Sequence, residues 1–214
     1  DGRRPDSLGP RRADRSGFSD LQCDKENSGT IIERTMRKEG KMAEKITVLI
    51  TEEEIDRRVR ELAAQISKDY EGRKIRMVGI LKGASFFMCE LAKRITVPVS
   101  IDFMQVSSYG GATESTGTVR IRKDLDESIE GLDVIIVEDI VDSGRTLAFL
   151  GDFLKSKGAK SIRYCTLLDK PERRVVDLKA DYAGFEIPDQ FVVGYGMDYD
   201  QEYRNLPYIG VVEL

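Results

Sequence analysis

Two adjacent carboxylates, Glu138 and Asp139, directly follow an apolar run of β-branched residues at 134–137. A run of this composition is typical of a buried strand in a parallel sheet. Residues 142–146, Asp-Ser-Gly-Arg-Thr, then lead into an amphipathic segment, and the backbone N–H groups of such a strand–loop–helix turn suit a phosphate. Acids beside a phosphate need a cation or a polyol between them. The stretch therefore predicts a site for a phosphorylated ribose with Mg²⁺, in which the ribose hydroxyl groups face the two acids.

Lys82 and Gly83 follow a second predicted strand, at 75–81. Ligands of open α/β sheets bind beyond the carboxyl ends of the strands, so Lys82 and Asp142 are expected on the same edge. A glycine with an accessible N–H group suits a diphosphate. Both features also have plainer interpretations, because glycines are common in strand–helix turns and Asp142 can simply cap the following helix. The cap alone is the weaker interpretation, since burying paired acids without a ligand is costly.

Lys170 follows the predicted strand 161–168 and so falls on that edge too, although its charged neighbours equally suit a solvated loop. Phe191 opens a segment whose composition by itself fits an ordinary strand with aromatic core residues. Two glycines that follow it indicate close approach of backbone or ligand. Asp198, just beyond them, is a candidate metal ligand. Arg204 either binds a phosphate or forms a surface ion pair.

Outside these residues, strands and helices alternate, which predicts an α/β fold with a mainly parallel sheet and a less regular C-terminal part. Thr51 and Glu54 form a capping-box pattern at the start of the first helix. Residues 107–117 form a polar segment that is typical of a mobile lid over an active site. The predicted strands are 46–50, 75–81, 97–106, 119–122, 134–137, 161–168, 183–187, 191–195 and 208–212, and the predicted helices are 52–70, 85–94 and one that ends near 157.

The length of 214 residues fits one domain, or one domain with a tail. Residues 1–41 are dominated by Arg, Asp, Ser and Gly without apolar periodicity, so we expect a disordered leader before a domain at 42–214. The net charge of −4 favours binding to neither nucleic acid nor an anionic membrane. No apolar run approaches the roughly 20 residues needed to span a bilayer.

Histidine is absent, which removes Ser-His-Asp catalysis, Cys-His catalysis and histidine-bound metal from consideration. The three cysteines, Cys23, Cys89 and Cys165, are too few and too scattered for a disulfide framework or a zinc site. The last two fall in apolar elements, so we expect them to be buried thiols of a protein in the reducing cytoplasm.

Taken together, these segments resemble a known family. The stretch 134–147 is similar to the phosphoribosyl-pyrophosphate (PRPP) signature of type I phosphoribosyltransferases. Residues 44–214 as a whole resemble bacterial hypoxanthine-guanine phosphoribosyltransferases, with one departure at Ala84, where relatives often carry Gly or Ser and where we expect no loss of function. The segments that carry the resemblance are 81–83, 107–110, 137–146, 167–171, 184–189 and 191–199.

The resemblance implies the type I phosphoribosyltransferase fold, which is a mainly parallel twisted sheet flanked by helices, with a mobile lid loop and a small hood subdomain. It implies purine salvage in the cytoplasm by a homodimer or homotetramer. PRPP and hypoxanthine or guanine would give IMP or GMP plus pyrophosphate, with Mg²⁺ as cofactor.

The resemblance also implies how PRPP is held. The two acids would hold the ribose hydroxyl groups and Mg²⁺, the loop after them would cradle the 5′-phosphate, and the turn after strand 75–81 would bind pyrophosphate through a cis peptide. The residues implied are, for the ribose phosphate, Glu138, Asp139, Asp142, Ser143, Gly144, Arg145 and Thr146; for pyrophosphate, Lys82, Gly83 and Arg204; and for Mg²⁺, Glu138, Asp139 and Asp198.

Recognition of the purine is implied in the same way. Lys170 would donate to O6 and so select oxo over amino purines, Phe191 would stack on the base, and the backbone of Val192 would read its edge. Asp142 would be the general base at N7, and lid closure would exclude water from the reacting centre. The implied lid residues are Ser108 and Tyr109.

Two alternatives remain open. A PRPP-responsive regulator on the same fold would bind nucleic acid and would need a basic face. The net negative charge and the presence of Lys170, Phe191 and Asp198 speak against it. An adenine or pyrimidine phosphoribosyltransferase would lack the segments 167–171 and 191–195. Hypoxanthine, guanine and xanthine all carry O6, so Lys170 does not rank them.

Overall fold

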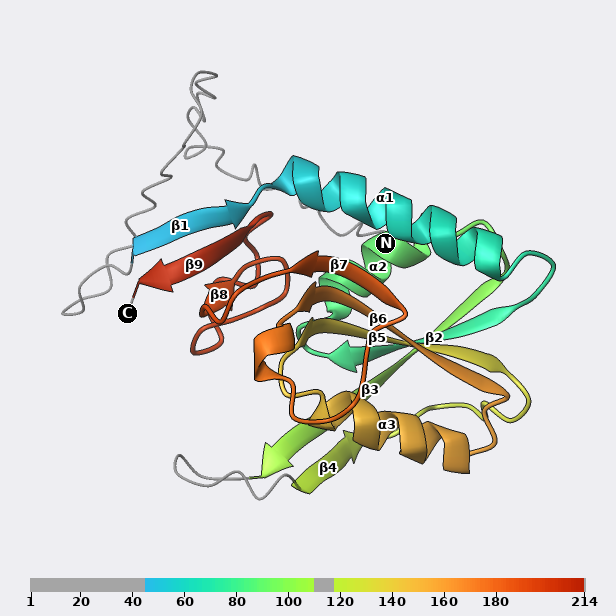
Figure 1. Cartoon of the computed structure of the whole chain (residues 1–214). Coiled ribbons are helices and arrows are strands. Elements are labelled where there is room, and N and C mark those ends of the chain that lie inside the picture. Colours follow the sequence, from blue (N-terminus) through green and yellow to red (C-terminus); the bar gives the residue numbers. More distant parts are fainter. Residues whose placement is uncertain (1–44, 110–117, 214) are drawn as a thin grey trace, which may run out of the picture. The chain divides into compact units, whose positions relative to one another are not determined.

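The computed structural model describes residues 45–109 and 118–213, so the predicted leader and residues 110–117 of the predicted lid lie outside the described part. Within it, strands and helices alternate as predicted (Figure 1). The elements are β1 Lys45–Ile50, α1 Glu52–Asp69, β2 Ile75–Leu81, α2 Ser85–Ala92, β3 Val99–Tyr109, β4 Thr118–Lys123, β5 Asp133–Val141, α3 Arg145–Ser156, β6 Ser161–Asp169, the 3₁₀ turn η1 Pro171–Arg173, β7 Tyr182–Glu186, β8 Val192–Val193 and β9 Ile209–Glu213.

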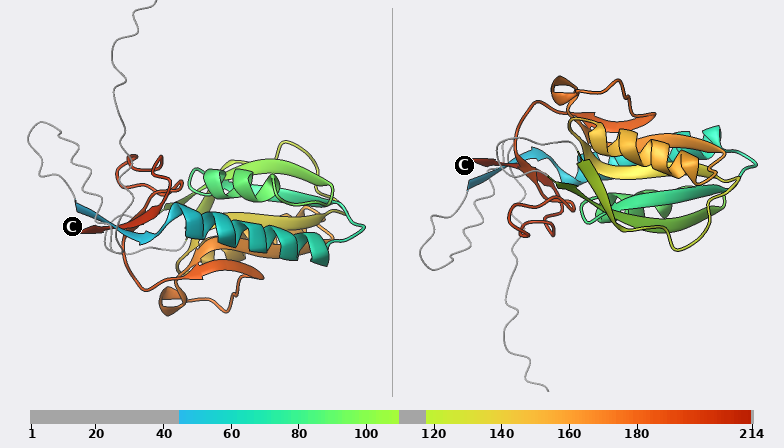
Figure 2. Two further views of the ribbon diagram at one scale, coloured as in Figure 1. Left: turned by 90° about the horizontal axis from the view of Figure 1, so that it is seen from above. Right: turned by 90° about the horizontal axis from the view of Figure 1, so that it is seen from below.

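A six-stranded sheet in the order β4-β3-β2-β5-β6-β7 forms the centre of the fold. Its strands are parallel except for β4, which pairs antiparallel with β3. Helices α1 and α2 cover one face of this sheet, and α3 covers the other (Figure 2). The predicted α/β class with a mainly parallel sheet is therefore confirmed. Because parallel strands end at one edge, the residues that follow β2, β5 and β6 share that edge.

A separate three-stranded antiparallel sheet, in the order β1-β9-β8, joins the first and last described strands. This small sheet corresponds to the small hood subdomain that the resemblance implies. The loop after β8 lies against the turn after β2. The two are so close at Gly196 that a Cβ atom built on this residue would lie 2.1 Å from the carbonyl oxygen of Gly83. The small sheet therefore stands at the carboxyl edge of the large one (Figure 1).

Helix α1 begins where its local sequence predicts. Thr51 Oγ1 accepts the N–H group of Glu54 at 3.3 Å, and Glu54 Oε2 accepts the N–H group of Thr51 at 2.9 Å, which completes the predicted capping box. The apolar face of the helix packs into the core, where burying each large aliphatic side chain contributes about 1.5–3 kcal/mol. The buried residues of this face are the predicted ones, Ile55, Val59, Leu62, Ala63 and Ile66.

Strand β5 lies between β2 and β6, and its apolar residues 134–137 are fully buried, as predicted. The strand does not end there. Pairing with β6 continues as far as Val141, which is registered with Asp169. Glu138 and Asp139 consequently lie inside the strand rather than after it, and their backbone directions are set by the sheet.

Three other expectations need correction. Strand β3 runs to Tyr109, which pairs with Thr118, so residues 107–109 of the predicted lid loop are part of a β-arm. Strand β8 covers only two residues, Val192 and Val193, because the chain then turns away. Cys89 is exposed on α2, whereas Cys165 is buried as expected. Among the described residues, every helix is too short or too polar to cross a membrane.

Candidate active site

Glu138 and Asp139 are consecutive residues near the end of β5. Glu138 Oε2 is buried without a hydrogen-bond partner in the described part of the chain. Burial, and then the charge of Asp139, raises the pKa of Glu138 well above its ordinary value. Burial also raises the pKa of Asp139 to about 6. Two desolvated acids of this kind favour a ligand that brings hydroxyl donors or a cation.

The loop from Asp142 to Gly144 turns β5 into α3. Gly144 is the N-cap of α3 and has a φ of 80°, in the left-handed region that favours glycine. Asp142 is therefore not the helix cap, contrary to the plainer interpretation of the sequence. Because a glycine offers no side-chain cap, the N–H groups of the first turn, where Arg145 and Thr146 lie, can face an anion. Ser143 Oγ accepts the N–H group of Arg145 at 3.4 Å.

The turn after β2, which carries Lys82 and Gly83, brings Gly83 against Asp139. The peptide between Leu81 and Lys82 is cis. A Cβ atom built on Gly83 would lie 1.6 Å from Asp139 Oδ2, so this position has no room for any side chain. The predicted pyrophosphate turn and the predicted ribose acid are thus in direct contact, although they are far apart in the sequence.

Lys82 also meets the loop that carries Asp198 and Arg204. Arg204 Nη2 lies 2.7 Å from Asp198 Oδ1, and its Nη1 donates to the carbonyl oxygen of Gly196 at 2.6 Å. Gln201 connects the two parts, because its Oε1 accepts from Lys82 Nζ at 2.9 Å and its N–H group donates to Asp198 Oδ2 at 2.8 Å. The sequence analysis missed Gln201. Its position has a φ of 68°, which no local sequence signal indicates.

Lys170 and Phe191 reverse the usual placement of their residue types. The lysine is buried, with 8% of its surface exposed, whereas the aromatic ring is 46% exposed. Lys170 Nζ donates to the carbonyl oxygen of Gln190 at 2.7 Å. The rings of Phe191 and Tyr199 form a T-shaped pair, with centroids 5.5 Å apart. Burial argues against the solvated-loop interpretation of Lys170. Val192, next to Phe191, is buried in β8.

Two arginines of the segment after β6 make contacts with Asp142 that the sequence did not predict, because their segment resembles an ordinary charged loop. Arg173 Nε lies 2.8 Å from Asp142 Oδ1. Arg174 Nε donates to the carbonyl oxygen of Asp142 at 3.2 Å, and its Nη2 pairs with Asp169 at the end of β6. A Cβ atom on Gly144 would lie 2.8 Å from the Arg174 side chain, so these arginines hold the loop after β5 in place. Their spacing from Asp142 in the sequence carries no signal of these contacts.

The predicted metal ligands do not by themselves form a metal centre. Within the described ranges, no three Asp, Glu, Cys or His residues are grouped closely enough to hold an ion. Asp198 is paired with Arg204, and its charge reaches Asp139, whose pKa it helps to raise. Mg²⁺ commonly keeps its waters and binds through one or two carboxylates plus substrate phosphates. The buried, unpartnered oxygen of Glu138 and the adjacent Asp139 fit that mode of binding.

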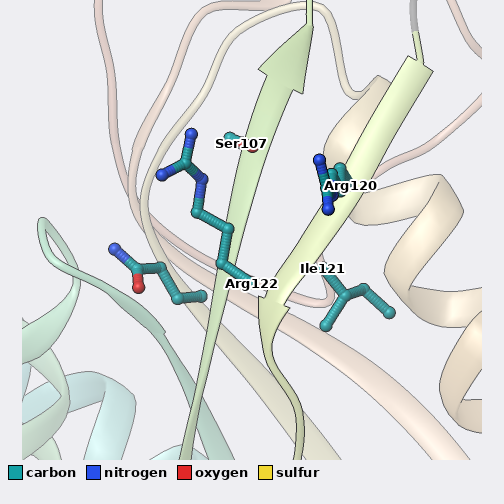
Figure 3. A pocket seen from close by; sticks show the side chains of 5 residues that line it. Ser107, Arg120, Ile121 and Arg122 are labelled. Carbon is teal, nitrogen blue, oxygen red and sulfur yellow. The ribbon is translucent and has the colours of Figure 1, made fainter.

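The predicted lid residues Ser108 and Tyr109 end β3 and pair with Val119 and Thr118 in β4. At the base of this arm is a pocket of about 500 Å³. Figure 3 shows the side chains of Arg120 and Arg122 on β4 and that of Ser107 on β3. The pocket is lined by Gln105, Ser107, Arg120, Ile121 and Arg122.

Comparison with known proteins gives matches over most of the chain. The family described as phosphoribosyl transferase domain matches residues 49–200. A hypoxanthine-guanine phosphoribosyltransferase of Bacillus subtilis is 54% identical over 166 residues, which cover 78% of this chain and 92% of that protein. The bifunctional protein TilS/HprT of Listeria monocytogenes is also 54% identical over 166 residues, but the chain spans only 26% of its length.

Solved structures give the same result. A crystal structure of a hypoxanthine phosphoribosyltransferase from Staphylococcus aureus is similar, with a TM-score of 0.75 and 55% identity, over 78% of this chain and 90% of that one. A hypoxanthine-guanine phosphoribosyltransferase from Bacillus anthracis, crystallised with HEPES in the active site, also has a TM-score of 0.75, at 52% identity, over 78% of this chain and 98% of that one.

Proposed function

The chain belongs to the phosphoribosyltransferase family and, within it, to the hypoxanthine-guanine phosphoribosyltransferases, and from this premise we propose that it transfers the phosphoribosyl group of PRPP to hypoxanthine or guanine. The products would be IMP or GMP and pyrophosphate, in purine salvage. The observation that carries the proposal is the buried Lys170 near the exposed ring of Phe191, at the sheet edge that also holds the acid pair. A planar oxo-purine needs such a donor and such an exposed aromatic ring.

We assign the ribose phosphate to the end of β5 and the loop after it. Glu138 and Asp139 would accept hydrogen bonds from the ribose hydroxyl groups, which relieves the desolvation that raises their pKa values. The 5′-phosphate would lie on the backbone N–H groups of 142–146 and the hydroxyl groups of Ser143 and Thr146. The N-terminus of α3, where Gly144 provides no side-chain cap, supports this placement, because a helix N-terminus attracts an anion.

Pyrophosphate is assigned to Lys82, Gly83 and Arg204. As the bond between C1′ and the pyrophosphate oxygen breaks, positive charge develops on the ribose ring and negative charge on the leaving group. Backbone N–H groups and a guanidinium held in place before the reaction stabilise that negative charge without reorganisation. The contact of Gly83 with Asp139 supports the assignment, because it puts the leaving group next to the ribose site.

Asp142 is assigned as the general base. Purine N9 attacks C1′ while the proton on N7 passes to the Asp142 carboxylate, which keeps the purine nucleophilic. Such proton transfer typically contributes about 10²–10⁴-fold to the rate. Lys170 donating to O6 and Phe191 stacking on the ring would fix the orientation in which N7 meets Asp142, and the Val192 backbone would read the ring edge.

Mg²⁺ is the proposed cofactor, held by Glu138 and Asp139, with Asp198 as ligand of a second ion. When bound, it would neutralise charge on the pyrophosphate. Ser108 and Tyr109 would belong to a lid that closes over the site and excludes water, which would otherwise hydrolyse the reactive sugar. We further propose a domain at 42–214 preceded by a leader at 1–41, a cytoplasmic location and a homodimer or homotetramer. The 78% of the chain that relatives match supports this domain assignment.

A spectrophotometric assay with PRPP and Mg²⁺ tests the proposal directly. Hypoxanthine and guanine should be turned over, and adenine should not, because its amino group at C6 cannot accept from Lys170. Xanthine in the same assay measures how strictly the C2 position is read. Absence of turnover with all three oxo-purines, from protein that is folded by circular dichroism, would contradict the proposal. No observation favours the nucleic-acid-binding alternative.

A further inference from the structure

Arg173 lies between two acids that belong to different parts of the proposed site. Its Nε lies 2.8 Å from Asp142 Oδ1, and its Nη1 lies 3.1 and 3.2 Å from the two carboxylate oxygens of Asp189. Asp142 is in the loop after β5, whereas Asp189 follows β7 and lies two residues before Phe191. One guanidinium therefore connects the proposed base with the wall of the proposed purine site.

The contact makes the two carboxylate oxygens of Asp142 different from each other. Oδ1 is buried and faces Arg173 at ion-pair distance, without the alignment of a hydrogen bond. The side chain as a whole is nevertheless 46% exposed, so its accessible acceptor is Oδ2. A general base needs an acceptor oxygen that is held in place and kept free for the proton. Arg173 occupies one oxygen and leaves the other to the substrate.

Arg173 is itself anchored through Asp189. Lys170 Nζ lies 3.5 Å from Asp189 Oδ1, so the carboxylate is shared between the two cations. The hydrogen bond to Asp189, and then the charge of Asp142, raises the pKa of Arg173, and Arg173 in turn lowers the pKa of Asp189. The same carboxylate thus connects the cation beside the base with the lysine that would bind purine O6.

We propose that Arg173 is a positioning residue for the transfer reaction, which holds the Asp142 carboxylate so that Oδ2 meets the N7 proton of a purine bound to Lys170. The inference rests on the proposed function. An arginine suits this task because its planar guanidinium presents N–H donors in a fixed fork, so it reaches two carboxylates at a set angle. Its effect should fall on the chemical step and on the purine, since correct orientation acts on the reacting groups and not on PRPP.

Steady-state kinetics of Arg173→Ala test the proposal. We expect kcat to fall about tenfold and the purine KM to rise about threefold through loss of orientation, while the PRPP KM stays unchanged. Arg173→Lys should recover part of the loss, because it keeps the charge but not the fork. Arg60→Ala, which removes an exposed ion pair with Asp56 on α1, is the matched control and should behave like the wild type. A kcat in Arg173→Ala equal to that of the wild type would overturn the inference.

Combination with Asp142→Asn separates positioning from a general structural effect. If Arg173 acts through Asp142, adding Arg173→Ala to Asp142→Asn should leave kcat where Asp142→Asn alone put it. Loss of the base alone should leave measurable turnover, because it is worth about 10²–10⁴-fold. Effects that multiply would show a separate role and refute the inference. A wild type inactive with every oxo-purine refutes the proposed function as well, whereas an active wild type with an unaffected Arg173→Ala refutes the inference alone.

Discussion

At the scale of single residues, Asp139 carries an electrostatic cost in the unliganded protein. Its pKa of about 6 lies above the ordinary 3.8, and burial is the largest cause. Between these two values the folded state binds the proton more readily than the unfolded chain does, so the free energy of unfolding falls as the pH rises through this window. Above it, the ionised carboxylate costs about 1–3 kcal/mol of stability. We interpret this cost as stability that the protein loses in order to keep a carboxylate for ligand binding. The cost can be measured by unfolding.

Asp139→Asn should therefore stabilise the unliganded protein by about 1–3 kcal/mol at pH 8, and by much less at pH 4.5, where the carboxyl group of the wild type is already protonated. The same variant should bind PRPP more weakly. Urea unfolding at the two pH values and titration with PRPP measure both effects. Asp152→Asn, at an exposed position of α3, is the control and should change neither. A variant less stable than the wild type at pH 8 would contradict the prediction.

Removal of the Lys170 amino group should weaken the use of the purine and leave the binding of PRPP unchanged. In Lys170→Gln, the purine kcat/KM should fall about 10- to 100-fold, because a hydrogen bond to a charged donor is worth about 1.5–3 kcal/mol. The PRPP KM should stay unchanged. Initial rates at varied hypoxanthine and varied PRPP separate the two effects. Lys179→Ala, in the exposed loop before β7, serves as the control. An unchanged purine KM would show that the assignment of Lys170 to O6 is wrong.

At the scale of elements, the sequence predicted correctly the bounds of those helices and strands whose signals lie within their own residues. Helix α1 has its cap and its apolar face within its own residues, and β2 is bounded by its own apolar run, so both were placed correctly. The ends of β3 and β5 were not, because each is prolonged by a neighbouring strand that supplies hydrogen-bond partners. Pairing between strands is a non-local property, which a local pattern does not contain.

The capping box of α1 gives a prediction at this scale. Thr51→Ala should lower the free energy of unfolding by about 1 kcal/mol, because it leaves the N–H group of Glu54 without its side-chain acceptor. Thr51→Ser keeps the hydroxyl group and should stay close to the wild type. Urea unfolding measures both variants, and kcat should be unchanged in each because α1 contributes no proposed site residue. A Thr51→Ala protein as stable as the wild type would show that the cap contributes nothing.

At the scale of the whole molecule, the site is assembled from segments that only the fold brings together. The acids and the loop of β5 were predicted because strand, acids, glycine and helix follow one another in the sequence. Gln201 and Arg173 were missed because their partners lie 119 and 31 residues away, at Lys82 and Asp142. Side-chain contacts across such distances depend on where two elements meet. Arg173 reaches Asp142 beyond the neighbouring strands β6 and β5 of the large sheet, whereas Gln201 reaches Lys82 at the junction between the large and the small sheet.

Gly196 is the point at which that junction can be tested. A Cβ atom there would lie 2.1 Å from the carbonyl oxygen of Gly83, and its φ of 104° is strained for any other residue. Gly196→Ala should therefore displace the β8 loop from the pyrophosphate turn, raise the PRPP KM about tenfold and cost about 2 kcal/mol or more of stability.

Gly131→Ala is the matched control for this change, because Gly131 has a φ of 72° with nothing within 4 Å of its Cβ position. It should cost about 1 kcal/mol through backbone conformation alone and leave the PRPP KM unchanged. Unfolding by urea and initial rates at varied PRPP compare the two variants. If both lose stability equally and neither changes the PRPP KM, contact between the two sheets does not shape the pyrophosphate site. A raised KM in Gly196→Ala alone would show that the small sheet holds the pyrophosphate turn in position.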